Sequence, residues 1–354
     1  MMADERERKI RDSKAVINDP NLQRYLHDVL CRAVGEARCG GIRIYVVRNA
    51  EVNASMAPNG MLVIYTGLLL LARNEAELAG IIGHEFAHFE LRHGLRGFKH
   101  ERTETDIFAW AGVAAGLAAT YGSGQSRQDA IKTSQSIQAD AVGSIYAFTR
   151  EQERDADLLS MAYLQSSKYN PACFADIWRR LMDEADATAR GRKQRSTRYD
   201  RVGFFATHPT SLDRATYLRD IAASTGKTGE DDSARYSDEL SIWRTQFLGD
   251  QVKLNDFEGT DYLIGQLVGS AWTGDLLYAR AELYRARGNP RDLISAIGFY
   301  REAIQKDPSN ADLYRGIGLA EMRGKDPDGA ENLKKYLAMK PDAEDRAMIS
   351  TLLQ

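Results

Sequence analysis

The chain has 354 residues, of which 43% are hydrophobic and 27% are charged, and its formal net charge is −3 at pH 7. That length exceeds a typical single compact domain and suits two. The composition supplies enough apolar residues for a substantial core and is unlike that of a disordered chain. The near-neutral charge argues against nucleic acid as a main partner.

The first residues, 1–13, are rich in charge and contain no apolar stretch of the kind that a signal peptide carries. We expect them to form an N-terminal tail. Two interpretations of the cellular location follow. Either the protein is cytoplasmic, or it is exported and its export segment is missing from this chain.

The three cysteines are Cys31, Cys39 and Cys173, and none of them lies in a C-x-x-C pair. This spacing argues against zinc binding by thiolates. Cys31 and Cys39 could be bridged across a turn. The odd count leaves at least one free thiol, so the cysteines do not decide the redox compartment.

Two segments have the character of β-strands. Residues 41–47 alternate between two faces, and residues 61–66 form a second apolar run after the turn signal Pro58-Asn59-Gly60. We expect a hairpin whose edge could bind an extended peptide through main-chain hydrogen bonds. The alternative is that these strands only build the core.

A helix is expected to follow the strands. Asn74 and Glu77 have the spacing of a capping box, apolar residues then recur with a helical period, and Gly94 could end the helix. The motif H-E-x-x-H occupies residues 84–88 in the middle of this helix. The relative geometry of its two histidines is therefore fixed.

Residues four apart on a helix lie on one face, so His84 and His88 can hold one zinc ion. Glu85 lies beside them, where it could polarise a water molecule at the metal. The motif is short enough to occur by chance, and its histidines could then be ordinary core residues. The rest of the chain has to decide between these alternatives.

A catalytic zinc needs a third protein ligand. His93 would not share the face of His88 on a continuous helix, so we interpret it as a histidine that favours the helix C-terminus. His100 has no spacing argument in its favour. A second helical run carries Glu153 and Asp157 four residues apart, where Glu153 could be the third ligand and Asp157 could fix a ligand imidazole. The alternative is a charged, solvated helix face.

Three further segments allow more than one interpretation. Residues 107–121 are apolar but shorter than the roughly 20 residues that span a bilayer. We expect a buried or interfacial helix there, which could make peripheral membrane contact. The Ser-, Gly- and Gln-rich residues 122–138 could form a lid that orders on substrate binding. The basic run 190–201 could border the cleft, but a solvated loop is the simpler interpretation.

The C-terminal third contains an internal repeat. Residues 225–240 are rich in Gly, Ser and Asp, which predicts a linker. Beyond them, Ala296 and Ala330 are 34 residues apart, as are Ala303 and Leu337. This period resembles that of tetratricopeptide repeats, whose helix pairs must stack to bury their apolar faces. Such a domain could bind a protein partner.

Five blocks of residues, in this order along the chain, resemble the gluzincin peptidases. That family includes the CAAX prenyl endopeptidases, the HtpX-like peptidases and the periplasmic β-barrel-assembly-enhancing peptidases. The blocks are Asn18-Asp19-Pro20 with Tyr25-Leu26, Val52-Asn53-Ala54 to Thr66-Gly67-Leu68-Leu69, Asn74 to His88 with His93 after it, Glu153 to Asp157, and Thr207-His208-Pro209 followed by Arg214. The second of these blocks resembles the edge-strand hairpin of the family.

The resemblance implies a role for each matching residue. His84, His88 and Glu153 would bind one Zn²⁺. Glu85 would act as general base on a water molecule at the zinc, and would later protonate the leaving amine.

The remaining roles come from the same resemblance. Asp157 would orient a histidine ligand. His208 could approach the metal and keep the enzyme latent, or could simply be a turn histidine before Pro209. Arg214 would stabilise the oxyanion or pack behind the ligands.

These expectations combine into one architecture. After the tail 1–13, an α+β zincin-like peptidase domain, mostly α with a small β-sheet, would occupy 14–224. The linker 225–240 and an α-helical tetratricopeptide-like domain over 241–354 would follow.

The expected function is that of a zinc metalloendopeptidase that hydrolyses unfolded or misassembled polypeptides. The alternative is a latent or inactive peptidase fold that serves as a chaperone-like scaffold through its repeats. The resemblance to envelope peptidases favours a periplasmic or cell-envelope location with a missing export signal.

Overall fold

The computed structural model describes residues 2–94, 148, 150–196 and 212–354. The chain divides into two compact units, Met1–Arg179 with Arg198–Tyr236, and Arg180–Thr197 with Ser237–Gln354. The helices and strands that lie in or enter the first unit are α1 (Met2–Arg11), α2 (Pro20–Val34), α3 (Glu36–Cys39), β1 (Arg43–Val47), β2 (Ala54–Met56), β3 (Met61–Tyr65), α4 (Thr66–Leu71), α5 (Glu75–Glu90), α9 (Arg150–Ser166), α10 (Ala172–Gly191), α11 (Leu212–Thr225) and α12 (Ser233–Val252).

In the described part of the first unit, three strands form one sheet in the order β1-β3-β2. β1 runs parallel to β3, whereas β2 runs antiparallel to it and pairs Ser55 with Val63. The expected hairpin therefore consists of β2 and β3, and the expectation that β1 pairs with β3 as a hairpin is wrong. Periodicity did not show β2, because a strand of three residues has too little alternation to be recognised. The family resemblance over residues 52–69 had implied an edge-strand hairpin, and β2 with β3 lies there.

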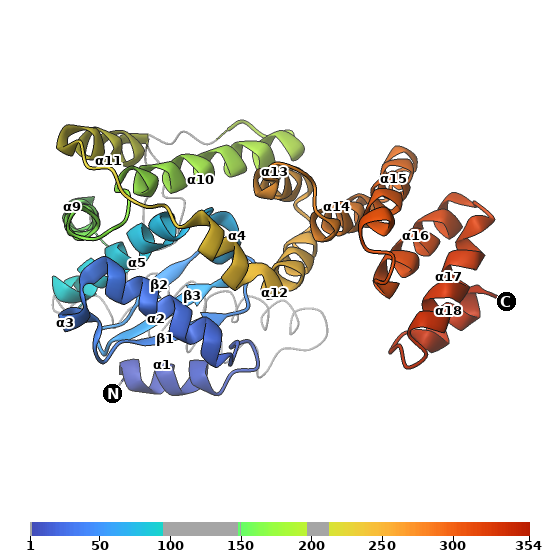
Figure 1. Ribbon diagram of the computed structural model, residues 1–354, viewed down its shortest axis with the longest axis horizontal. Helices are drawn as coiled ribbons and strands as arrows, with labels where there is room; N and C mark the ends of the chain where they lie inside the picture. The colour runs from blue at the N-terminus through green and yellow to red at the C-terminus, as the bar shows by residue number, and fades with distance from the viewer. Residues whose placement is uncertain (1, 95–147, 149, 197–211) are drawn as a thin grey trace, which may run out of the picture. The chain divides into compact units, whose positions relative to one another are not determined.

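The central strand β3 is covered on both faces. Ala57, Met61 and Val63 form one small core, against which Ile10 of α1 packs. The helices α2 and α5 pack against each other and against the sheet, where α2 contacts β1 and α5 contacts β2 (Figure 1). Edge strand β2 therefore lies beside the helix that carries the H-E-x-x-H motif.

The N-terminal residues are helical and docked, unlike the expected tail. Acidic residues in the first turn of α1 and basic residues in its last turn favour the helix through its dipole. Glu7 accepts hydrogen bonds from Arg43 and Tyr45 of β1 and from Asn59. A charged amphipathic helix and a charged tail look alike in sequence when, beyond Met2 and Ala3, Ile10 is the one apolar residue of the segment.

The polar segment 225–240 is likewise ordered rather than a free linker. Glu230 forms a β-bridge with Tyr169, and α12 begins at Ser233. Arg235 pairs with Glu75 at the start of α5, and the Tyr236 hydroxyl donates to the Leu69 carbonyl. The polar residues that suggested a linker here make specific contacts.

The second unit begins within α10 and continues through paired helices. Near the end of α10, the Thr188 hydroxyl donates to Asp256 over 2.6 Å. Each helix pair, α14 with α15 and α16 with α17, is packed side by side, and α15 also packs on α16 (Figure 1). The remaining helices of this unit are α13 (Phe257–Leu267), α14 (Gly274–Arg287), α15 (Pro290–Lys306), α16 (Ala311–Gly324), α17 (Asp328–Met339) and α18 (Arg346–Leu352).

The core of the second unit only partly matches the 34-residue spacing, because Ala296 and Ala303 are buried whereas their partners Ala330 and Leu337 are only half-buried. Ala296 and Ala303 are fully buried on α15, where they join Tyr300 and residues from α14 and α16 in one cluster. Leu333 and Tyr336 of α17 form the next cluster with Tyr314. The prediction of a mostly helical chain with a small sheet and a helical C-terminal region is confirmed.

Several expectations concern residues outside the described part of the chain. They are the apolar segment 107–121, the lid 122–138, His100, His208 and the end of the basic run 190–201. Among the helices that the structure describes, none is both long and apolar enough to cross a membrane.

One glycine at the start of α4 lies against the loop between β1 and β2 and gives a test of the fold. A Cβ atom on Gly67 would lie 2.3 Å from the carbonyl oxygens of Ala50 and Glu51, which are backbone atoms and cannot rotate away. We expect Gly67→Ala to lower the free energy of unfolding by at least about 2 kcal/mol, the upper part of the usual range. Chemical unfolding followed by circular dichroism measures this change.

Gly40→Ala is the matched control, because nothing lies within 4 Å of a Cβ atom at that position. We expect it to change stability by no more than about 1 kcal/mol. Equal effects of the two substitutions would show that the close approach at Gly67 is wrong.

Candidate metal centre

The helix α5 places two histidines on one buried face. Asn74 caps the helix by accepting a hydrogen bond from the Glu77 N–H over 2.8 Å. The Glu77 carboxylate accepts from the N–H of Arg73, one residue before the position that a capping box uses. His84 and His88 follow one turn apart on this helix, with their Nε2 atoms 3.1 Å apart. Both side chains are almost completely buried.

The helix α9 supplies the third side chain. Glu153 places Oε2 3.5 Å from His84 Nε2 and Oε1 3.5 Å from His88 Nε2. One atom from each of the three residues lies within 4.8 Å of the other two, so the three can share a metal ion. The predicted ligand set is therefore brought together by the fold.

A close approach between α5 and α9 makes this possible. The Ser160 hydroxyl of α9 donates to the Gly80 carbonyl of α5 over 2.7 Å. A Cβ atom on Gly83 would lie only 2.8 Å from the same hydroxyl oxygen. Glycine directly before His84 therefore allows α9 to approach closely enough for Glu153 to reach the histidines.

Each histidine is held through its other ring nitrogen. Asp157 Oδ1 lies 2.9 Å from His84 Nδ1, as predicted for a residue that orients a ligand. His93 Nδ1 lies 2.9 Å from His88 Nδ1, and Phe148 stacks on the His88 ring with centroids 3.8 Å apart. With Nδ1 of each ligand occupied in this way, Nε2 is left to face a metal.

The position of His93 differs from the expected one, which assumed a continuous helix. The helix ends at Glu90, four residues before the expected stop at Gly94, and Arg92 adopts a left-handed conformation with φ of 56°. The chain therefore turns back, and His93 becomes buried against His88. No spacing rule for helices could have placed it there.

Arg214 on α11 connects the two carboxylates of α9. Its Nε and Nη2 atoms donate to Asp157 over 2.7 and 2.6 Å, and its Nη1 lies 2.8 Å from Glu153 Oε2. The guanidinium also lies over the Trp178 ring, 4.0 Å from the centroid. These contacts place Arg214 behind the ligands and favour that interpretation over oxyanion stabilisation.

The electrostatics of the site suit a bound cation. Burial raises the pKa of Asp157, but the charges of Arg214 and His84 outweigh it and lower the pKa to about 2. Burial lowers the pKa of His84, but Asp157 and Glu153 outweigh it and raise the pKa to about 9. The pocket therefore favours positive charge at the position of the histidine nitrogens.

The donor set fits zinc in particular. Two imidazoles and one carboxylate are a known set of protein ligands for catalytic zinc, with one position left for water or substrate. Among the described residues, the formal charges of Glu85, Glu153 and Asp157 exceed that of Arg214 by two. A divalent cation would balance this excess.

Glu85 faces a small cavity next to the ligands. Together with His84 it lines a cavity of about 10 Å³, whose other walls include Asn53 and Ala54 at the sheet edge and Trp178. A volume of this size has room for about one water molecule. The carboxylate is thus close to the ligands, to a water-sized space and to the edge strand β2.

A larger cavity of about 370 Å³ is lined in part by His88. Its walls are largely apolar and come from the end of β2, the turn after it and the end of α5. They are Met56, Pro58, His88, Phe89, Glu90, Arg92, Gly94 and Phe148.

The contact between His93 and His88 can be tested by metal affinity. We expect His93→Ala to weaken zinc binding about 10- to 100-fold, because His88 would lose the partner that fixes its ring. Competition with a chromogenic chelator measures this affinity. His93→Gln is the control, since its amide oxygen can still accept from His88 Nδ1. Wild-type affinity in His93→Ala would contradict the assignment.

The chain is similar in sequence to several known proteases. The beta-barrel assembly-enhancing protease of Escherichia coli (strain K12) is 27% identical over 191 residues, which are 53% of this chain and 38% of that protein. Metalloprotease LoiP of Escherichia coli (strain K12) is 26% identical over 220 residues, 61% of this chain and 77% of LoiP. The mitochondrial metalloendopeptidase OMA1 of Schizosaccharomyces pombe is 24% identical over 192 residues, 54% of this chain and 50% of OMA1.

The chain thus matches well under half the length of the Escherichia coli beta-barrel assembly-enhancing protease. Residues 17–222, more than half of this chain, match the model of peptidase family M48. The matched range contains the H-E-x-x-H motif, Glu153, Asp157 and Arg214. The resemblance inferred from these motifs is confirmed, and the chain belongs to peptidase family M48.

Proposed function

We propose that this chain is a zinc-dependent endopeptidase in which His84, His88 and Glu153 hold the metal. One observation carries the proposal. The three ligand atoms converge, and Glu85 and His84 line the same water-sized cavity beside the edge strand β2. Membership of a metallopeptidase family supports the same conclusion.

The ligands define where the metal would act. When bound there, zinc would lower the pKa of a water molecule and polarise the carbonyl of the scissile bond. Asp157 and His93 keep Nε2 of each histidine directed at the shared position. Arg214 acts as a positioning residue, because it holds both Glu153 and Asp157.

Glu85 moves the protons in this mechanism. Its carboxylate takes a proton from the attacking water and then transfers that proton to the nitrogen of the leaving amine. His84 and His88 lie on the same helix, so the distance between the base and the ligands is fixed by one turn of α5. His208 lies outside the described residues, and a role for it in latency stays a prediction.

The edge of the sheet suggests how a polypeptide is held. β2 has β3 on one side, and its residue Ala54 borders the Glu85 cavity. An extended peptide could add to this edge through main-chain hydrogen bonds, with little dependence on its sequence. A side chain of that peptide could enter the apolar cavity beside Met56, Phe89 and Phe148.

Such recognition favours unfolded or misassembled proteins, because only they present extended backbone. One similar protein is named as a beta-barrel assembly-enhancing protease, which fits a role in protein quality control. The helix pairs of the second unit are tetratricopeptide-like and would bind a protein partner or recruit substrate. The disulfide between Cys31 and Cys39 favours an oxidising compartment such as the cell envelope.

One substitution can separate the general-base function of Glu85 from zinc binding. We expect Glu85→Gln to lower the rate of casein cleavage about 100- to 10,000-fold, the usual contribution of a general base, while zinc content stays at the wild-type level. Glu151→Gln on the exposed start of α9 is the control and should cleave at the wild-type rate. Wild-type activity in Glu85→Gln would rule out this mechanism.

Metal dependence and substrate state can be tested together. We expect a chelator to abolish cleavage of casein and added zinc to restore it. A compact folded protein should be cut far more slowly than the same protein after unfolding. If the chelated protein cleaves as fast as before, zinc is not required; if both substrates are cut equally, recognition of extended backbone is wrong. Zinc binding without any cleavage would favour a scaffold role.

A further inference from the structure

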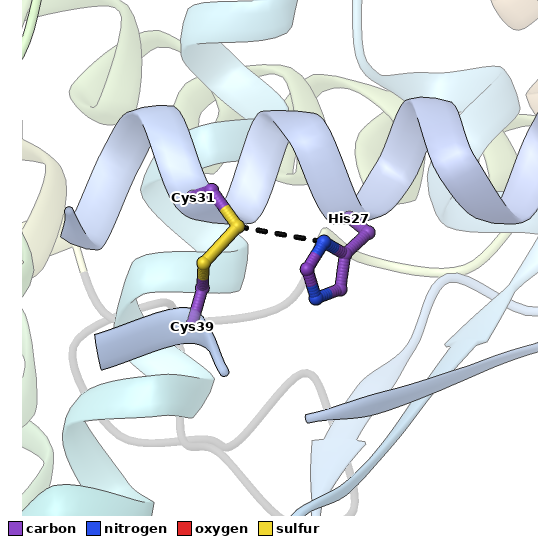
Figure 2. A group of neighbouring side chains, drawn as sticks. All are labelled: His27, Cys31 and Cys39. Atoms are coloured by element: carbon purple, nitrogen blue, oxygen red, sulfur yellow. Dashed lines mark hydrogen bonds between the residues drawn. A yellow bond between two sulfur atoms is a disulfide. The ribbon is translucent and has the colours of Figure 1, made fainter. Parts of the chain in front are cut away.

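A second cluster of metal-binding side chains lies at the junction of α2 and α3. His27 and Cys31 are one helical turn apart on α2, and Cys39 ends α3 (Figure 2). Cys31 and Cys39 form a disulfide, and His27 Nδ1 lies 3.4 Å from Cys31 Sγ. The imidazole points towards the sulfur atom in Figure 2.

We propose that the reduced form of this cluster is a zinc site, separate from the candidate metal centre on α5 and α9. One ligand atom from each of His27, Cys31 and Cys39 lies within 4.8 Å of the other two. The absence of a C-x-x-C pair argued against thiolate zinc binding. The fold nevertheless brings the two cysteines and a histidine together, although they are not adjacent in sequence.

The separation of His27 and Cys31 suits a tetrahedral zinc ion, and the two sulfur atoms would move apart once the disulfide is reduced. A sulfur and a nitrogen ligand of one tetrahedral zinc lie about 3.5 Å apart, given the usual bond lengths. The observed separation of His27 Nδ1 and Cys31 Sγ is 3.4 Å. Two thiolates and one imidazole are also ligands that zinc prefers over harder cations.

A fourth ligand is available beside Cys39. The carboxylate of Glu36 comes within 4.0 Å of Cys39 Sγ, and Glu36 is exposed. It could complete the coordination sphere, or a water molecule could do so. The cysteines themselves are buried, with exposed fractions of 5% for Cys31 and 3% for Cys39.

The chemical steps balance with a dithiol or phosphine reductant. The reductant gives two electrons, the S–S bond breaks, and two protons are taken up to form the thiols of Cys31 and Cys39. A dithiol supplies the two protons itself and leaves as its disulfide, whereas a phosphine leaves as its oxide, with one water molecule supplying the oxygen atom and the two protons. Zn²⁺ then displaces the two thiol protons, and two Zn–S bonds form.

The disulfide and the zinc would be alternative connections between the same two helices. In the oxidised protein, a covalent bond ties α2 to α3; in the reduced protein, the metal would. This junction is linked to the end of the H-E-x-x-H helix, because Arg38 on α3 lies 3.7 Å from Glu90. The third cysteine does not compete, since burial raises the pKa of Cys173 to about 12.

The test counts metal in the oxidised and the phosphine-reduced full-length protein. One portion of each sample is loaded with Co²⁺ and another with Zn²⁺. Each portion is passed over a desalting column, and its metal content is measured by elemental analysis. We expect the reduced sample to retain one more equivalent of metal per chain than the oxidised sample. The Co²⁺ form of that extra equivalent should show thiolate-to-metal charge-transfer absorption, and bound Zn²⁺ should slow re-formation of the disulfide.

Substitutions of single residues identify which side chains bind the extra equivalent of metal. His27→Ala and Cys39→Ser should each lose it, whereas Cys173→Ala should keep it. The proposal fails if the two samples hold equal metal, if the disulfide resists reduction in the folded protein, or if the extra cobalt lacks thiolate absorption. Because the result is a difference between two redox states, it does not depend on occupancy of the candidate metal centre.

Discussion

The structure of the candidate site depends on how two carboxylates on one face of α9 are tolerated inside the protein. Glu153 and Asp157 are both buried and four residues apart, where like charges repel. Arg214 lies against both of them, and Tyr217 donates a further hydrogen bond to Asp157. The helix α11, some 50 residues further along the chain, is therefore needed for the site that α5 and α9 form.

This arrangement divides the two carboxylates between different tasks. Asp157 is occupied by Arg214, Tyr217 and the Nδ1 side of His84, so it acts as a support. Glu153 has one oxygen near Arg214 and reaches the Nε2 atoms of both histidines with its carboxylate. The imbalance of charge that remains is what a divalent cation would compensate. Asp157 and Glu153 are both carboxylates, and it is their different contacts that make one a support and the other a candidate ligand.

Residues at fixed helical spacing could be predicted from the sequence. The pairs His84 with His88 and Glu153 with Asp157 each follow from the i, i+4 rule, and the capping residue Asn74 follows from its position before an apolar run. His93 and Trp178 could not be predicted in this way. One depends on a turn after the helix end, and the other on tertiary packing under Arg214.

The strand order and the ends of the domains also depend on contacts that local sequence patterns do not reveal. A strand of three residues, β2, forms the edge beside Glu85, and it carries too little alternation to be found from periodicity, so only the family resemblance indicated it. The docking of α1 and the start of α12 depend on pairs such as Glu7 with Arg43 and Arg235 with Glu75. Polar residues that pair over long distances in the chain look the same in sequence as polar residues in solvent.

The central claim is that His84, His88 and Glu153 hold one zinc ion. The most direct test is X-ray absorption at the zinc edge on the oxidised, zinc-loaded protein, in which the disulfide withholds the thiols of Cys31 and Cys39. The account predicts one zinc per chain with two imidazoles, further nitrogen or oxygen ligands and no sulfur. A protein that holds no zinc after loading, or a zinc ion with sulfur ligands, would contradict it.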